Sequence, residues 1–145
     1  MTIQRIVLDT NVLVAASRSR NGASFVLLEM LRDARFIALA SVPLMLEYEA
    51  VLQRPEHLAA SQRSPAMVTA FLDAFCLLCE PVHLHYLWRP QTRDPADEMV
   101  LETALNGRAD ALVTMNVNDF SAAELFRLPV LLPRHLLAAL RLEIK

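Results

Sequence analysis

Apolar positions along the chain form short runs separated by longer stretches of helical periodicity. Residues 3–8, 36–40 and 111–114 are runs rich in aliphatic side chains, a pattern typical of buried strands. Residues 82–86 and 129–132 repeat this pattern more weakly. The sequence therefore predicts about five short strands.

The stretches between these strands carry the end signals of helices. Three of them begin with serine or aspartate shortly before a proline, which favours a helix start because the side chain caps free N–H groups and proline needs no N–H there. Gly107 follows the last of the three as a stop signal. The predicted helices span about 23–33, 41–54, 64–79 and 94–106, with shorter ones near 121–126 and 133–141.

Strands that alternate with helices predict a three-layer α/β/α sandwich with a mostly parallel central sheet, here a single domain over residues 1–145. Ligands in such folds bind beyond the carboxyl ends of the strands. Asp9 ends the first predicted strand and Asn11 starts the next helix. Ser41 and residues 114–119 lie at the same edge. This edge is the expected functional site.

Composition narrows the classes of function. The chain has 145 residues and a formal net charge of −2, so its charge alone gives no argument for nucleic-acid binding, although bound cations can neutralise acids and phosphate together. Its two glycines exclude a glycine-rich phosphate loop. No apolar stretch reaches the ~18 residues of a membrane span, and Asp9 interrupts the N-terminal apolar run, which makes a poor signal peptide. A cytoplasmic protein is expected.

Asp97 follows the predicted helix start in "RDPADEMVLETAL". An acid in the first turn of a helix often only complements the helix dipole on a solvated surface. Asp97, however, shares a helical face with Val100, Leu101 and Ala104, which are expected in the core. A carboxylate on that face needs a partner.

Two further acids present the same choice. Glu47 lies on a stripe with Leu44 and Tyr48, and spacing separates it only weakly from Glu49 or from a partly exposed acid of an amphipathic helix. Asp119 follows the 111–114 strand, where it could equally cap the next short helix. Asp9, Glu47, Asp97 and Asp119 together would place four acids at one edge. Such crowding is costly without cations, and oxygen-only ligands suit Mg²⁺ or Mn²⁺.

Four segments resemble, in family order, the PIN-domain nucleases, and in particular the VapC-like toxin components of bacterial toxin–antitoxin pairs. They are "VLDTNVLVAA", "SVPLMLEYEAVLQR", "DPADEMVLETAL" and "ADALVTMNVNDF", and "LPVLLPRHLL" resembles the last strand and helix of the family. The resemblance covers nearly the whole chain. It favours Asp97 over Asp94, because family members place a small residue seven positions after the acid, where this chain has Ala104.

The resemblance implies an endoribonuclease that uses Mg²⁺ or Mn²⁺. Asp9, Asp97 and Asp119 would hold the metal, and Glu47 would ligate it or orient the attacking water. Asn11 and Thr114 would fix the geometry of the carboxylates. Many relatives have an aspartate where this chain has Asn116, which can act as a neutral oxygen ligand.

The resemblance also implies partners. RNA is the expected substrate, and the nearest basic candidates for phosphate contacts are Arg18, Arg20 and Arg93. A small antitoxin protein and a homodimer are expected, whereas a membrane is not.

Other interpretations compete with this one. Cys76, Cys79, His83 and His85 have compact zinc-ligand spacing, but they span a helix–strand junction, and buried helical cysteines explain the pair better. A PIN-like module that only binds a protein partner would keep the fold without catalysis. An aspartyl phosphatase would need a second aspartate where this chain has Asn11.

Overall fold

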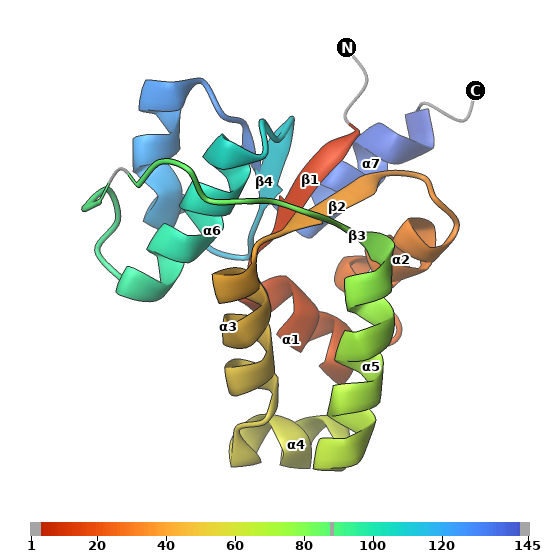
Figure 1. The fold of residues 1–145 in the computed structure, drawn as a ribbon. Helices are drawn as coiled ribbons and strands as arrows, with labels where there is room; N and C mark the ends of the chain where they lie inside the picture. The colour runs from red at the N-terminus through yellow and green to blue at the C-terminus, as the bar shows by residue number, and fades with distance from the viewer. Residues whose placement is uncertain (1–3, 88, 143–145) are drawn as a thin grey trace.

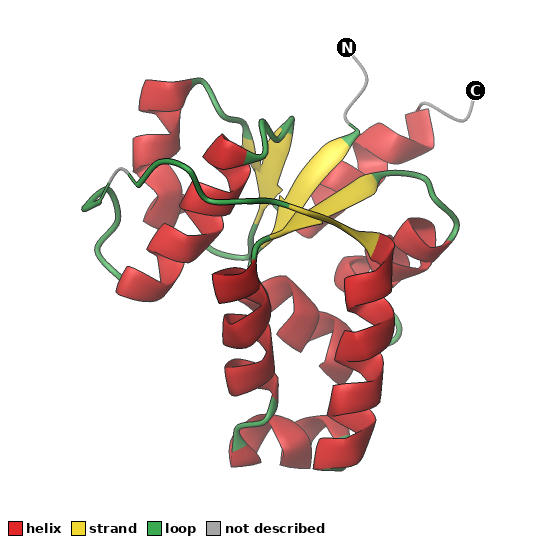
Figure 2. Ribbon diagram, in the orientation of Figure 1, coloured by secondary structure: helices red, strands yellow, loops and turns green. Residues whose placement is uncertain are grey.

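The computed structural model describes residues 4–87 and 89–142. Its centre is a sheet of five parallel strands in the order β3-β2-β1-β4-β5 (Figure 2). The strands are β1 (Arg5–Leu8), β2 (Ile37–Ala40), β3 (Cys79–Pro81), β4 (Ala111–Val113) and β5 (Val130–Leu131).

Helices connect the strands. In the described part of the chain they are α1 (Thr10–Arg18), α2 (Ala23–Arg32), α3 (Val42–Leu52), α4 (Pro55–Ser61), α5 (Pro65–Leu78), α6 (Pro95–Asn106), the 3-10 helix η1 (Val117–Phe126) and α7 (Pro133–Leu142). None of these helices is long and apolar enough to cross a lipid bilayer.

The helices form two layers around the sheet. Helices α6 and η1 pack together on one side of it, and α2 packs against α7 on the other (Figure 1). Helices α3, α4 and α5 form an arm that extends away from the sheet, with α1 against α3 (Figure 1). The predicted three-layer α/β/α fold with a parallel five-stranded sheet is confirmed.

The predicted helix starts are correct because their causes are local. Ser41, Ser64 and Asp94 each cap a helix through a side-chain oxygen that accepts a backbone N–H, from Leu44, Met67 and Ala96 respectively. Each of the three helices has proline in its first two positions. Capping and proline together fix these boundaries.

The strand predicted at 82–86 is wrong. The strand that pairs with β2 is β3, with Cys79 opposite Ala38 and Pro81 opposite Ala40. An edge strand tolerates this proline because its missing N–H breaks no second ladder. The next residues leave the sheet, and the N–H groups of His85 and Tyr86 donate to the Asn106 side chain at the end of α6.

Two helices also differ from the prediction. Helix α4 was not predicted: the preceding helix was expected to end at about Arg54, and residues 55–61 were assigned no element, whereas α4 begins at Pro55 with Arg54 as its N-cap. The helix expected near 121–126 starts earlier, at Val117, with Asn116 at its N-cap and Asp119 in its first turn.

Candidate active site at the carboxyl edge of the sheet

Asp9 directly follows β1 and is the N-cap of α1. Its side chain is buried, and its two oxygens accept hydrogen bonds of 2.7 Å, from the Thr10 N–H and from the Thr114 hydroxyl. Burial raises the pKa of the Asp9 carboxyl and the charges of Asp119 and Asp94 add to this, while the two hydrogen bonds act in the opposite direction. The carboxyl is thus fixed in orientation in surroundings that disfavour its charge.

Thr114 joins the ends of β1 and β4. Leu8 pairs with Val113 in the sheet, so the residues after them, Asp9 and Thr114, are neighbours. The fully buried Thr114 hydroxyl donates to Asp9 and accepts from the Asn11 Nδ2 at 3.3 Å and the Asn116 N–H at 3.1 Å. The Asn11 Oδ1 accepts the Met115 N–H at 3.1 Å. Asn11 and Thr114 therefore lie where they can support the Asp9 carboxylate.

Asp97, in the first turn of α6, is half-buried at the rim of the same edge. Burial together with the negative charges of Asp9, Asp94 and Asp119 raises the pKa of its carboxyl from 3.8 to about 7. A shift of this kind arises where several acids share a poorly solvated site. Four aspartates are therefore electrostatic neighbours at this edge.

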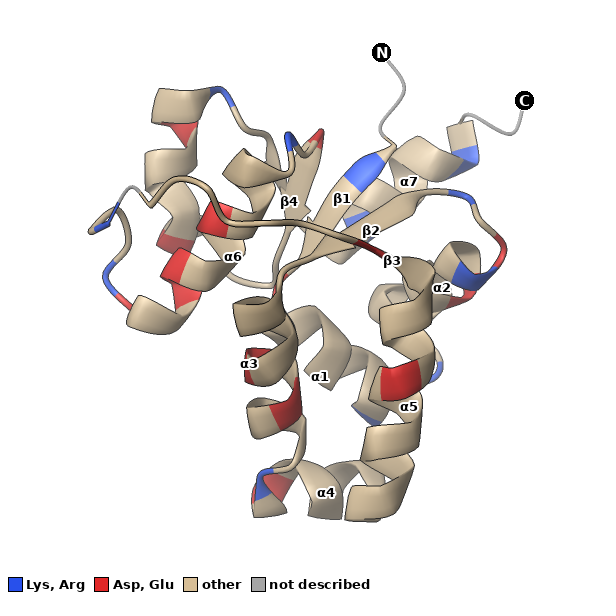
Figure 3. Cartoon of the chain, in the orientation of Figure 1, with Lys and Arg blue, Asp and Glu red and all other residues tan. Residues whose placement is uncertain are grey.

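An open cleft of about 810 Å³ lies beside these acids. It is lined by the first turns of α6 and η1 and by the loop before α6; the lining residues are Pro90, Gln91, Thr92, Arg93, Asp94, Asp97, Asn118, Asp119 and Ser121. The red acidic positions gather on α6, and the loop beside it carries blue basic positions (Figure 3). The cleft thus combines carboxylates with the guanidinium of Arg93.

Glu47 does not line this cleft. It lies half-buried on α3, one residue before the fully buried Tyr48, and it is not among the charges that raise the pKa of Asp97. Glu47 therefore belongs to the arm formed by α3, α4 and α5 and not to the wall of the cleft.

The predicted arginines divide into two groups. Arg93 lines the cleft with Asp97 and Asp119. Arg18 is hydrogen-bonded to the His57 ring at 2.7 Å at the far end of α1, about 13 Å along the helix from Asp9. Arg20 lies in a separate pocket beside Arg18. Asn116 is exposed at the start of η1, and its backbone N–H contacts Thr114.

Sequence reasoning missed three polar residues around the site. The Tyr48 hydroxyl donates to the carbonyl of Leu8, the residue before Asp9. Glu98 and Glu102 are buried on α6 and bind the loop that forms the cleft wall. Their spacing of four residues signals a shared helix face, but it does not reveal that a loop covers this face.

The residues of the competing zinc interpretation lie away from the cleft. Cys76 is exposed and Cys79 half-buried, and both are free thiols. The prediction that both are buried on a helix is wrong, because Cys79 begins β3. The His83 and His85 rings lie 6.4 Å apart between centroids.

Carboxylate and amide oxygens dominate the donors of the cleft, and this set suits Mg²⁺ or Mn²⁺. Within residues 4–87 and 89–142, no three acid, imidazole or thiol groups converge on a single point. Magnesium in proteins often keeps several waters and takes only one or two carboxylates. The aspartates therefore fit a partly hydrated divalent cation.

The fold is shared with solved structures of similar extent. The chain is 17% identical to a chain of VapBC2 from Rickettsia felis bound to a DNA fragment from its promoter; the match covers 89% of this chain and 97% of that chain, with a TM-score of 0.59. It is 19% identical to a chain of FitAB bound to an IR36 DNA fragment, over 88% and 94% of the two chains, with a TM-score of 0.57. A comparison with curated protein sequences gave no match.

A family model provides the assignment that these distant structures cannot. The model described as PIN domain matches residues 5–118, which include β1 to β4 and three of the four aspartates, Asp9, Asp94 and Asp97; Asp119 follows directly after the matched range. PIN domains are generally nucleases. The chain belongs to the PIN domain family.

Proposed function

We propose that the protein is a metal-dependent endoribonuclease that hydrolyses RNA phosphodiester bonds, and that it is the toxin of a cytoplasmic toxin–antitoxin pair. One observation carries this proposal: four aspartates share one edge of the sheet, where burial and the charges of its neighbours raise the pKa of Asp97 to about 7. Mutual repulsion of this kind is relieved by a divalent cation. Membership of the PIN domain family supports a nuclease.

Asp9, Asp97 and Asp119 are the proposed metal-holding residues, with Mg²⁺ or Mn²⁺ as the ion. Such an ion supplies Lewis-acid charge for the phosphoryl oxygens and lowers the pKa of water. Asn116, the N-cap of η1, is proposed as an additional neutral oxygen ligand.

The chain's other groups orient the reactants. The Thr114 hydroxyl and the Thr10 N–H fix the Asp9 carboxylate, and Asn11 fixes Thr114. Arg93, which lines the cleft, is the proposed contact for phosphate. Glu47 lies outside the lining of the cleft, and its proposed role in orienting water rests on the resemblance to PIN domains alone. In the hydrolysis, the oxygen of water bonds to phosphorus, one ester P–O bond breaks, and the leaving oxygen becomes a hydroxyl. A carboxylate of the cleft takes the proton that water gives up.

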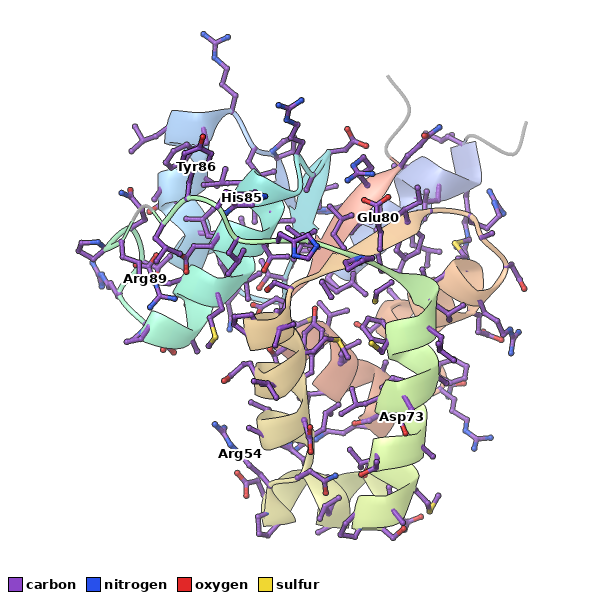
Figure 4. All side chains as sticks on the ribbon, in the orientation of Figure 1. Arg54, Asp73, Glu80, His85, Tyr86 and Arg89 are labelled. Atoms are coloured by element: carbon purple, nitrogen blue, oxygen red, sulfur yellow. The ribbon has the colours of Figure 1, made fainter. Side chains whose placement is uncertain are left out.

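Cleavage of a mixed RNA pool tests the proposal. Purified protein freed of partners is incubated with Mg²⁺ or Mn²⁺, and then with excess EDTA. Asp9→Asn keeps the size of the side chain and should reduce the rate by at least about 100-fold, since even supporting residues of metal sites cost 10–100-fold. Asp73→Asn is the matched control, because Asp73 is exposed on α5, away from the cleft (Figure 4).

Cleavage that needs metal and is lost only in Asp9→Asn would support the nuclease. A folded protein that cuts with neither metal would contradict it and favour a PIN-like module that acts by binding a protein.

The proposed partners are a small antitoxin and a second copy of the chain. The resemblance to VapC-like toxins and the shared fold with chains of the VapBC2 and FitAB structures support this proposal. Co-expression with a small neighbouring reading frame, followed by light scattering of the purified material, measures both. A monomer that no such product binds would contradict this part of the proposal.

A further inference from the structure

A covering segment, residues 85–87 and 89–93, is attached along one face of α6 by three side chains spaced four residues apart. We call Glu98, Glu102 and Asn106 the polar ladder. The Asn106 side chain binds the backbone of His85 and Tyr86 at 2.9–3.0 Å. One oxygen of Glu102 accepts two hydrogen bonds from Arg89, at 2.7 and 2.9 Å. One oxygen of Glu98 accepts the N–H groups of Gln91 and Thr92.

The two carboxylates that hold the segment are buried. Glu98 and Glu102 are 4% and 1% exposed, and a buried carboxylate is tolerated only where charge or hydrogen bonds compensate it. The labelled His85 and Arg89 lie on the segment that crosses α6 (Figure 4). The segment is therefore held to the helix by buried charge rather than lying loosely over it.

The ladder ends beside the cleft. Glu98 follows Asp97 in the first turn of α6, so one turn carries both a cleft acid and the anchor of the wall. Both chain neighbours of Arg93 are hydrogen-bonded. The Thr92 N–H donates to Glu98, and the Thr92 hydroxyl donates to the Asp94 carbonyl at 2.8 Å. Asp94 in turn caps the helix. The backbone of Arg93 is thereby fixed.

The two arginines of the segment have different roles. Arg89 forms an ion pair with Glu102. Arg93 is exposed, faces the cleft, and forms no ion pair with a described residue. We infer that Glu98 and Glu102 are positioning residues that hold the covering segment as the wall of the cleft on which Arg93 binds a phosphate of the nucleic-acid substrate. This inference rests on the proposed function.

RNA binding without metal tests it separately from cleavage. A fluorescein-labelled single-stranded RNA of mixed sequence is titrated with EDTA-treated protein at pH 6 over a range of KCl concentrations. Arg93→Ala should weaken binding about tenfold, the value of one charge-assisted hydrogen bond. It should also reduce the slope of log K against log salt by about 0.7, as for one lost phosphate contact on a single strand.

The Glu98 variants separate positioning from simple charge. Removal of a negative charge near RNA should by itself strengthen binding. Positioning predicts the opposite for Glu98→Ala: binding as weak as in Arg93→Ala, with no further loss in the double variant. Glu98→Gln keeps an oxygen that accepts the two N–H groups and should bind at least as well as the wild type. Amide exchange at Gln91 and Thr92 should speed up only in Glu98→Ala.

Thr92→Ala tests the inference if Glu98→Ala does not fold, because it removes only the hydrogen bond to the Asp94 carbonyl. It should weaken RNA binding by a smaller factor than Glu98→Ala. Its effect should also not add to that of Arg93→Ala. Unchanged or tighter binding in Glu98→Ala, additive effects with Arg93→Ala, or no RNA binding by the wild type would each overturn the inference. RNA binding with this pattern but without cleavage would contradict the nuclease alone.

Discussion

At the residue scale, Asp9 shows why one position can serve both structure and chemistry. As the N-cap of α1 it satisfies the first N–H of the helix with one oxygen, and the other oxygen is fixed by Thr114. A capping acid is predictable from the sequence, because capping depends on neighbours in the chain. The partner hydroxyl is not local: the strand pattern placed Thr114 at this edge, but only the resemblance to PIN domains indicated that it supports the carboxylate.

Asp97 should make the stability of the metal-free protein depend on pH. Its carboxyl binds a proton more tightly in the folded state, with a pKa of about 7, than in the unfolded state near 3.8. The free energy of unfolding contributed by this group therefore falls as pH rises from about 4 to 7. Asp97→Asn should match the wild-type Tm at pH 4 and exceed it at pH 8.

The Tm difference at pH 8 should be about 2–5 °C, because solvent screening of a partly exposed carboxyl limits the effect to roughly 1 kcal/mol. Thermal unfolding in EDTA from pH 4 to 8 measures it, and added Mg²⁺ should reduce the gap. Parallel Tm curves for the two proteins would show that Asp97 is not crowded by other acids.

Thr114→Val replaces the hydroxyl by a methyl group at nearly the same side-chain volume and should impair the site. It leaves the buried oxygen of Asp9 and the donors of Asn11 and Asn116 without their partner, which costs about 1–3 kcal/mol. Mg²⁺ affinity should fall about 10–100-fold. Denaturant unfolding and calorimetric titration of Mg²⁺ check the two effects. Thr114→Ser keeps the hydroxyl and should stay close to the wild type in both, whereas an equal loss in Thr114→Ser would point to the methyl group.

At the scale of elements, α6 is the helix on which most of the site depends. Val100, Leu101 and Ala104 face the core as predicted, and Asp97 on the same face reaches the cleft. Glu98 and Glu102 are buried, although acids on a helix usually lie on a solvated face. The segment that covers them comes from outside the helix, so helical periodicity cannot reveal it.

The strands of the sheet could likewise be predicted only in part from the sequence. The strands β1, β2 and β4 were predictable because their aliphatic runs are buried on both faces. The edge strand β3 has the sequence Cys79-Glu80-Pro81, which carries no strand signal. Its position is set by the register with β2 and by the Arg5–Glu80 ion pair.

Gly107 is expected to be needed for packing, where α6 meets β2. A Cβ there would lie 2.8 Å from the Val82 side chain and 3.0 Å from Leu39. Gly107→Ala should therefore destabilise the fold by about 1–3 kcal/mol. Gly22→Ala is the matched control, because its added methyl group meets nothing closer than 3.9 Å. Denaturant unfolding compares the two, and an equal cost would show that backbone entropy rather than packing is responsible.

At the scale of the whole molecule, the helix at the tip of the arm and the helix that covers the sheet differ in how many side chains they bury. Helix α4 at the end of the arm contributes no buried residue, whereas α7 buries Leu136 and Leu140 against the sheet layer. Local opening requires less free energy where few apolar contacts are lost. The arm tip should be the most easily opened part of this fold.

Hydrogen exchange measures that difference. Amides of α4 should exchange at least about 100-fold faster than those of α7, an opening free energy lower by about 2.7 kcal/mol. The two helices have similar lengths, 7 and 10 residues, so the comparison isolates burial. Equal protection would mean that another molecule covers the arm tip in solution.

The bond between Asp9 and Thr114 joins residues 105 positions apart. A ribosome that synthesises this chain therefore makes the first acid of the site almost at once, but the hydroxyl that fixes this acid comes only with residue 114 of 145. Prematurely terminated copies that stop between Asp97 and Thr114 carry both acids without the hydroxyl that fixes the first of them. Under the function proposed above, translation that stops there would thus release fragments whose site is not assembled.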